Sequence, residues 1–302
     1  MDADKRRAVL LVMAAVICDY IGVGMMRVTL PFYTEALGGG AALMGGVETA
    51  YGMGQVLGAL ILPRLSDRIG RRPVLMLSFA GSAVGYALAI AARAAASPQL
   101  LLLSRLPVGL AKQTVTVSRA VVADCTASDH EGGGIEARSL WMSWLGTAIG
   151  IGYSLGPFLG GQLAERVSDG APAMVATAIF ALLLPAAALA LPETAPGLGA
   201  TSSATIRSKS ELPLWQVRKV RIALAVLALP ELGLVAHTSV TLYAFCLRTL
   251  GKGKAWLGNL TSATAALQAL LAGLLLPRLS SRGWSDGFLL HLGAWSFALA
   301  CA

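Results

Sequence analysis

Charged side chains are scarce in this sequence: Asp, Glu, Lys and Arg together make up only 13% of its 302 residues. A typical soluble domain carries about 25%. With 56% hydrophobic residues and a mean hydropathy of +0.68, a soluble fold of this size would have too little polar surface to cover its core. The composition therefore excludes an ordinary soluble domain and predicts an all-α protein of the lipid bilayer.

The sequence also lacks the patterns that metal, redox or nucleotide chemistry would need. Its four cysteines have no paired spacing, so they indicate neither a disulfide framework nor a zinc site. It contains neither a G-x-x-x-x-G-K-[ST] loop nor a dinucleotide fingerprint. We therefore expect no enzymatic activity, no metal and no cofactor. The formal charge of +8 does not indicate nucleic acid as a partner, because the basic residues lie in short segments between apolar runs.

Long apolar runs dominate the chain instead. A helix needs about 20 predominantly apolar residues to cross a bilayer. The first run is too long for a signal-peptide core, and no cleavage site follows it. Eight runs reach this length and a ninth is partial: 8–30, 41–63, 74–94, 99–121, 140–163, 173–191, 222–246, 255–277, and 287 to the end. We predict a multi-pass integral membrane protein.

Basic residues predict the orientation of these spans. Fifteen Lys and Arg residues fall in segments on the same side as the N-terminus, and five fall on the other side. Cytoplasmic loops carry an excess of Lys and Arg. The N-terminus is therefore predicted to be cytoplasmic.

A polar stretch and an internal repeat predict two unequal parts. Residues 193–221 are rich in Ser, Thr, Gly and Pro and then basic, which favours a cytoplasmic linker between an N-terminal six-helix bundle (1–192) and a second part (222–302). The pattern LPRLS-x-R at the end of the second span returns near the end of the eighth span, 214 residues later. Such a repeat predicts two six-helix halves. The second part holds only three spans, so we expect an incomplete C-terminal bundle.

The segment LSDRIGRRPV, at residues 65–74, carries a resemblance to a known family. It resembles the loop between spans two and three of the major facilitator superfamily, although Pro63 stands where the family usually has Gly. The resemblance covers essentially the whole chain and implies the fold of that family. It also implies that the loop and an acid below span four gate the cytoplasmic face; the alternative is that its arginines only anchor the topology. The implied gating residues are Asp67, Arg68, Gly70, Arg71, Arg72 and Asp124.

A glycine-rich pattern in the fifth predicted span narrows the resemblance. Glycines three to four residues apart form a smooth helix face for close packing, and a proline within them kinks the helix. The pattern resembles the antiporter motif of the drug/proton antiporter branch, which includes tetracycline-efflux-like and organic-cation-transporter-like members. Packing alone is the alternative interpretation. The residues are Gly146, Gly150, Gly152, Gly156, Pro157, Gly160 and Gly161. The triplet Pro192-Glu193-Thr194 is also typical of this branch.

Ionisable residues inside the spans are the candidate coupling residues, because charge in a membrane interior is costly. They are Asp19, Arg105, Glu48 and Lys112. Asp19 is the first candidate for binding a proton or a cation; the alternative is a structural pair with Arg105 or Lys112. Lys112 needs an acid or an anionic substrate, and Glu48 forms either an entrance pair or an interfacial salt bridge with Arg27. Arg105 belongs to a pattern, SRLPVG, similar to the family's arginine-plus-glycine motif.

These features together predict a secondary active transporter that moves a small organic solute or drug in exchange for protons. Its expected partners are the lipid bilayer, the small-molecule substrate and protons. Two alternatives stay open: a facilitator or symporter of a small solute, and a non-transporting protein or inactive fragment of the same fold.

Overall fold

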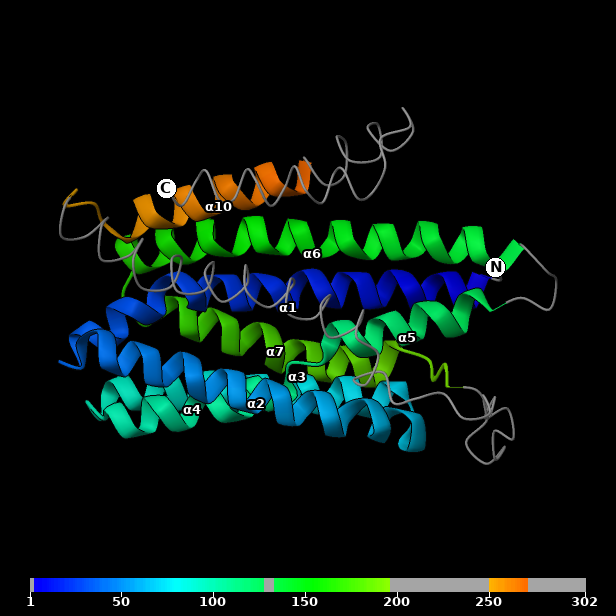
Figure 1. Cartoon of the computed structure of the whole chain (residues 1–302), viewed down its shortest axis with the longest axis horizontal. Coiled ribbons are helices and arrows are strands. Elements are labelled where there is room, and N and C mark those ends of the chain that lie inside the picture. The colour runs from blue at the N-terminus through cyan, green and yellow to red at the C-terminus, as the bar shows by residue number, and fades with distance from the viewer. Residues whose placement is uncertain (1–2, 128–132, 196–249, 271–302) are drawn as a thin grey trace, which may run out of the picture.

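The computed structural model describes residues 3–127, 133–195 and 250–270, which form helices joined by short turns, with no strand among them. The helices are α1 (Ala3–Ala36), α2 (Gly40–Ile69), α3 (Arg71–Ala94), α4 (Pro98–Ala111), α5 (Thr114–Thr126), α6 (Gly133–Arg166), α7 (Ala171–Ala190) and α10 (Lys254–Leu270). They run nearly side by side in one bundle (Figure 1). The predicted all-α fold class is confirmed.

The outside of the bundle is apolar, as a lipid-facing surface requires. Large side chains such as Leu182 and Leu189 are exposed, while α1, α3 and α7 are each long and apolar enough to cross a bilayer. The predicted spans 222–246 and 287 to the end, and the second copy of the repeat, lie outside the described residues. Below, the N-terminal end of the bundle is the end where α1 begins, and the opposite end is where α1 ends and α10 begins.

The predicted span 99–121 differs from the structure, because it is two helices rather than one. α4 ends at Ala111 and α5 begins at Thr114. Between them Lys112 has ψ 57°, outside the helical range, and its N–H bonds to Gly109 three residues back. Pro107 in α4 has no N–H to donate, which already weakens the ladder of this segment. The break turns the Lys112 side chain into the bundle, where it meets an acid.

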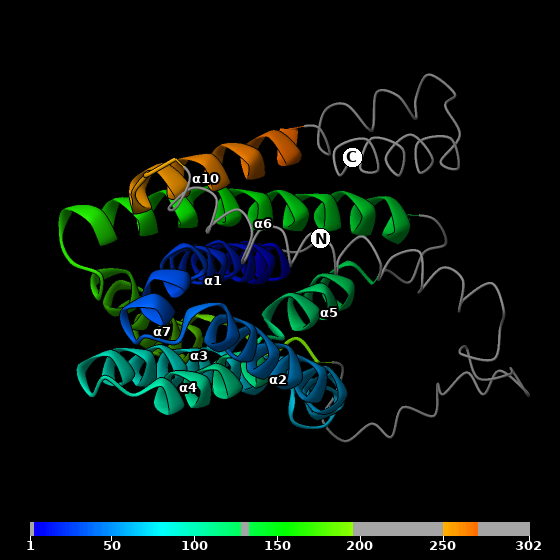
Figure 2. The ribbon, with the colours of Figure 1, turned by 60° about the vertical axis from the view of Figure 1, so that its left-hand side comes forward.

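The helix α6 lies between α1 and α10. It packs along α1 on one side and along α10 on the other, while α2, α3, α4 and α7 form the rest of the bundle across α1 (Figures 1 and 2). The helix α5 lies against α1 and α6 at the N-terminal end. The fifth predicted span is therefore the element that joins the first six spans to α10.

Glycines of α6 allow these close contacts. A Cβ atom added at Gly156 would lie 2.8 Å from the Cα of Gly24 on α1, and one at Gly161 would lie 2.7 Å from the carbonyl oxygen of Lys254 on α10. Both distances are shorter than any real Cβ contact, so only glycine fits. Gly146 differs from this expectation, because a Cβ there would meet nothing within 4 Å. The motif therefore packs on two neighbours through its second part.

We predict that Gly156→Leu destabilises the bundle by about 1–3 kcal/mol, because its side chain would be forced against the backbone of α1. The measurement is the melting temperature of the detergent-solubilised protein. Gly146→Leu is the matched control in the same motif and is expected to melt within about 1 °C of the unsubstituted protein, since its site is open. Equal losses from both substitutions would contradict the packing described here.

Candidate functional site

The centre of the bundle contains a buried ion pair between α1 and the α4–α5 break. The Nζ of Lys112 donates to Oδ2 of Asp19, and the two side chains are 7% and 0% exposed. The ammonium also lies over the ring of Tyr20, 4.5 Å from its centroid, and that ring packs against Tyr153 of α6 at 4.8 Å. We call Asp19, Tyr20, Lys112 and Tyr153 the central cluster. Of the two partners that the sequence left open for Asp19, the structure shows Lys112.

Arg105 lies on α4, the helix that ends just before Lys112, but it is not part of the central cluster. It is 4% exposed, its Nε donates to the Oγ of Ser104 at 3.1 Å, and its guanidinium stacks on Tyr86, 5.6 Å from the ring centroid. Glu48 is half-buried on α2, within electrostatic range of Arg27 and Arg105. Among the described residues, Asp19 forms its ion pair with Lys112 and none with Arg105, the other coupling residue that the sequence predicted.

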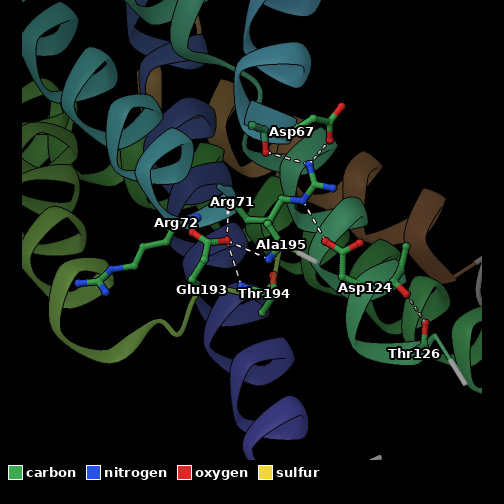
Figure 3. Close-up of polar contacts among 10 residues, drawn as sticks. Asp67, Arg71, Arg72, Asp124, Thr126, Glu193, Thr194 and Ala195 are labelled. Atoms are coloured by element: carbon green, nitrogen blue, oxygen red, sulfur yellow. Dashed lines mark hydrogen bonds and ion pairs between the residues drawn. The ribbon is translucent and has the colours of Figure 1, made fainter. Parts of the chain in front are cut away.

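A second polar cluster closes the N-terminal end of the first six predicted spans. Arg71, at the start of α3, contacts Asp67 at 2.5 Å and Asp124 at 2.9 Å, so it joins α2, α3 and α5 (Figure 3). The carboxylate of Glu193 accepts hydrogen bonds from the backbone N–H groups of Arg71 and Arg72, at 2.8 and 3.2 Å. We call Asp67, Arg71, Asp124 and Glu193 the gate cluster. Arg68 is exposed and makes no ion pair within the part of the chain described by the structure.

Sequence reasoning did not predict the role of Glu193. The helix α3 begins Arg71-Arg72-Pro73 without an acid of its own, so its N-terminal N–H groups lack a partner in the sequence nearby. Glu193 supplies it from just beyond α7, and carboxylates at this end are favoured by the helix dipole. Gly70 is also required, since its φ of 106° suits glycine and a Cβ there would collide with Glu193. The sequence did contain a signal for this contact. The first turn of α3 has no acidic residue to accept hydrogen bonds from its N–H groups, and the Pro192-Glu193-Thr194 triplet provides one.

A third polar cluster lies at the opposite end and connects α3 to α10. Asp169, in the turn before α7, contacts Arg93 at 2.8 Å and also pairs with Lys254, the first residue of α10. Glu165 of α6 accepts a hydrogen bond from the N–H of Ala255 at 2.7 Å, which caps α10. We call Arg93, Glu165, Asp169 and Lys254 the opposite-end cluster. None of these four residues was singled out from the sequence.

Electrostatics keep Asp169 ionised. Partial burial by itself raises the pKa of Asp169, but the hydrogen bond and charge of Lys254, and then those of Arg93, outweigh it and hold this pKa below its ordinary value of 3.8. No group of three or more His, Cys, Asp or Glu side chains gathers as metal ligands in residues 3–127, 133–195 and 250–270.

Comparison with known proteins agrees with this architecture. Residues 12–302 match the Major Facilitator Superfamily. The chain is 35% identical to the class E tetracycline resistance protein of Escherichia coli over 191 residues, 62% of this chain and 44% of that protein. It is 29% identical to solute carrier family 22 member 18 of Rattus norvegicus over 264 residues, 84% of this chain and 61% of that protein.

A solved structure shares the fold. The crystal structure of the human organic anion transporter MFSD10 (TETRAN) superposes with a TM-score of 0.60 and 23% sequence identity, covering 90% of this chain and 72% of that one. A helical bundle with an apolar outside and a buried ion pair defines an integral, multi-pass membrane protein. Within that class, the chain belongs to the Major Facilitator Superfamily. It spans about half the length of the tetracycline resistance proteins that it matches.

We predict that Arg71→Gln lowers the stability of the protein by about 1–3 kcal/mol, because it leaves the half-buried Asp124 without its cation. Thermal unfolding in detergent measures the effect. Arg64→Gln is the control, since Arg64 is an exposed arginine of α2 without an ion pair to any described residue. A loss from Arg64→Gln as large as that from Arg71→Gln would argue against a specific gate cluster.

The opposite-end cluster predicts a pH dependence. Because the folded-state pKa of Asp169 is lowered, its stabilising contribution is present above its ordinary value of 3.8 and is lost as the pH falls through the lowered pKa. Asp169→Asn is therefore expected to lower the melting temperature at pH 7, and this loss should shrink progressively as the pH falls below 3.8.

A double-mutant cycle tests which partner matters. Lys254→Met should destabilise the unsubstituted protein at pH 7 and have a smaller effect in the Asp169→Asn background, because the ion pair is already broken there. Additive losses would mean that Asp169 and Lys254 do not interact.

Proposed function

We propose that the protein is a secondary transporter that exchanges a small organic solute or drug for protons. The observation that carries this proposal is the buried ion pair between Asp19 and Lys112. A buried ion pair is weak evidence for a stability role, because well-packed apolar residues often replace one without loss. Ionisable groups inside a membrane bundle are instead typical of ion and proton pathways.

The family supports transport, and the relatives suggest its chemistry. The similar proteins from Escherichia coli are tetracycline resistance proteins, the rat relative is a solute carrier, and the similar solved structure is an organic anion transporter. We infer that this chain handles a small organic molecule, with Asp19 and Lys112 as the coupling pair and Arg105, about 10 Å along the same helix, beside it.

The two end clusters give this proposal a gating scheme. With the N-terminus cytoplasmic, as the basic residues predict, the gate cluster belongs to the cytoplasmic side and the opposite-end cluster to the outer side. Access from one side requires the contacts at that side to separate while those at the other side hold, and the packed helices move as bundles. We propose that α6 serves as the pivot, because it packs on both α1 and α10.

We predict that the full 302-residue chain, reconstituted in liposomes, takes up tetracycline when the lumen is made acidic relative to the outside. Asp19→Asn should reduce this uptake at least roughly tenfold, because the site can no longer exchange a charge. The control is Asp4→Asn, which removes an exposed acid from the first turn of the same helix and should transport normally.

The outcomes separate the alternatives. Uptake driven by the solute gradient alone, unchanged by pH and by Asp19→Asn, would indicate a facilitator. Uptake in the same direction as the proton gradient would indicate a symporter. Absence of uptake under any gradient would favour a non-transporting protein of the same fold.

A further inference from the structure

The surroundings of the Lys112 ammonium have the chemistry of an organic-cation site. Its Nζ is held by a carboxylate, that of Asp19, and by an aromatic face, that of Tyr20 at 4.5 Å. A carboxylate beside aromatic rings is the arrangement by which proteins recognise ammonium groups. The chain's own lysine therefore occupies a place where an ammonium from outside the protein would also be stable.

Asp19 has unused capacity in this arrangement. Its Oδ2 accepts from Lys112, while its Oδ1 is buried and has no hydrogen-bond partner among the described residues. An ionised carboxylate accepts hydrogen bonds at both oxygens, and leaving a buried acceptor without a donor is costly. Because the side chain is completely buried, bulk water does not reach this oxygen. A further cation or hydrogen-bond donor would therefore stabilise it.

The charges around the pair restrict what can bind. The titratable groups within electrostatic range of the pair are Cys18, Tyr20, Tyr51, Tyr86, Arg119 and Tyr153, from α1, α2, α3, α5 and α6. The buried Arg105 of α4 acts on Tyr86 and Tyr51, and its charge is opposed by that of Glu48 on α2. The tyrosines and the cysteine are neutral near pH 7, and Arg119 is exposed. Asp19 and Lys112 thus balance each other, and an added cation would leave one uncompensated buried charge.

A proton leaving Lys112 restores the balance. An ammonium that has lost its carboxylate partner in a buried site is costly and becomes neutral instead. The step conserves charge: the organic cation takes the place of the Lys112 ammonium on Asp19, the N–H bond of Nζ breaks, and its proton passes to water on the open side of the protein. No oxidation occurs, and no bond of the solute is made or broken.

We propose that Asp19 and the Tyr20 ring bind the cationic group of a monovalent organic cation, and that Lys112, rather than Asp19, releases the proton exchanged for it. This inference rests on the proposed function and adds the substrate class and the identity of the proton donor. It also implies an electroneutral exchange of one proton for one monovalent cation. Lys112 acts as the internal competitor of the substrate.

The test measures binding rather than transport. Tetraphenylphosphonium, a permanent cation without an ionisable proton, is added to the detergent-solubilised chain in weakly buffered solution with a pH indicator, and its binding is measured in parallel by equilibrium dialysis. We expect about one proton to be released for each cation bound. Tetraphenylborate, of the same size and opposite charge, should neither bind at this site nor release protons.

Three variants locate the charge and the proton. Lys112→Arg keeps a cation beside Asp19 but cannot lose its proton, so proton release should disappear and affinity should fall at least roughly tenfold. Asp19→Asn should abolish binding, and Asp19→Glu should retain both binding and release. Melting temperatures without the probe show whether each variant is folded.

A measurement on the unsubstituted protein is independent of folding defects in the variants. At pH 7 the unsubstituted protein should release about one proton for each cation bound, whereas binding that leaves the proton on Lys112 should release none. Cation binding without proton release, release retained in Lys112→Arg, or equal binding of tetraphenylborate would each overturn the inference. Loss of liposome transport with proton release intact would overturn the proposed function and leave the inference standing, whereas pH-driven transport without proton release would do the opposite.

Discussion

The buried ion pair between Asp19 and Lys112 is the interaction on which the rest of this molecule depends. Lipid provides no partner for a charge, and Asp19 and Lys112 neutralise each other inside the bundle. Lys112 reaches Asp19 only because the polypeptide leaves helical geometry between α4 and α5. That departure in turn requires α4 to be held firmly, and the glycines Gly54 and Gly58 of α2 bring their backbone against it.

Charge inside this bundle is concentrated at three levels along its long axis. The gate cluster lies at the N-terminal end, the central cluster near the middle, and the opposite-end cluster where α10 begins. The regions between them are packed through small residues and apolar side chains. The glycine face of α6 runs from the level of the central cluster to that of the opposite-end cluster, and it touches α1 at Gly156 and α10 at Gly161. Such a smooth face suits a helix about which its neighbours turn.

The sequence predicted the class of fold well, because apolar runs and glycine spacing are local patterns. The resemblance to the family's loop motif also grouped Arg71 with Asp67 and Asp124, which the structure places in contact. It did not predict that the span 99–121 divides, because membrane helices tolerate proline and Pro107 therefore did not mark a break by itself. Glu193 and Asp169 were missed for another reason. Each contacts a helix end that is far away in sequence, Glu193 the start of α3 and Asp169 the start of α10, and only the folded bundle brings each acid to its partner.

The division of the fourth span also bears on how the chain enters a membrane. The helices α4 and α5 have 14 and 13 residues, or about 21 and 20 Å as α-helix, and the hydrocarbon core measures about 30 Å. Neither is long enough to be stable across lipid by itself, and without α1 the break between them would expose both backbone groups and the Lys112 ammonium to lipid. During biosynthesis this divided span must therefore wait for, or be received by, a previously inserted α1 that offers Asp19. The order of the helices along the gene thus provides the acid before the lysine that needs it.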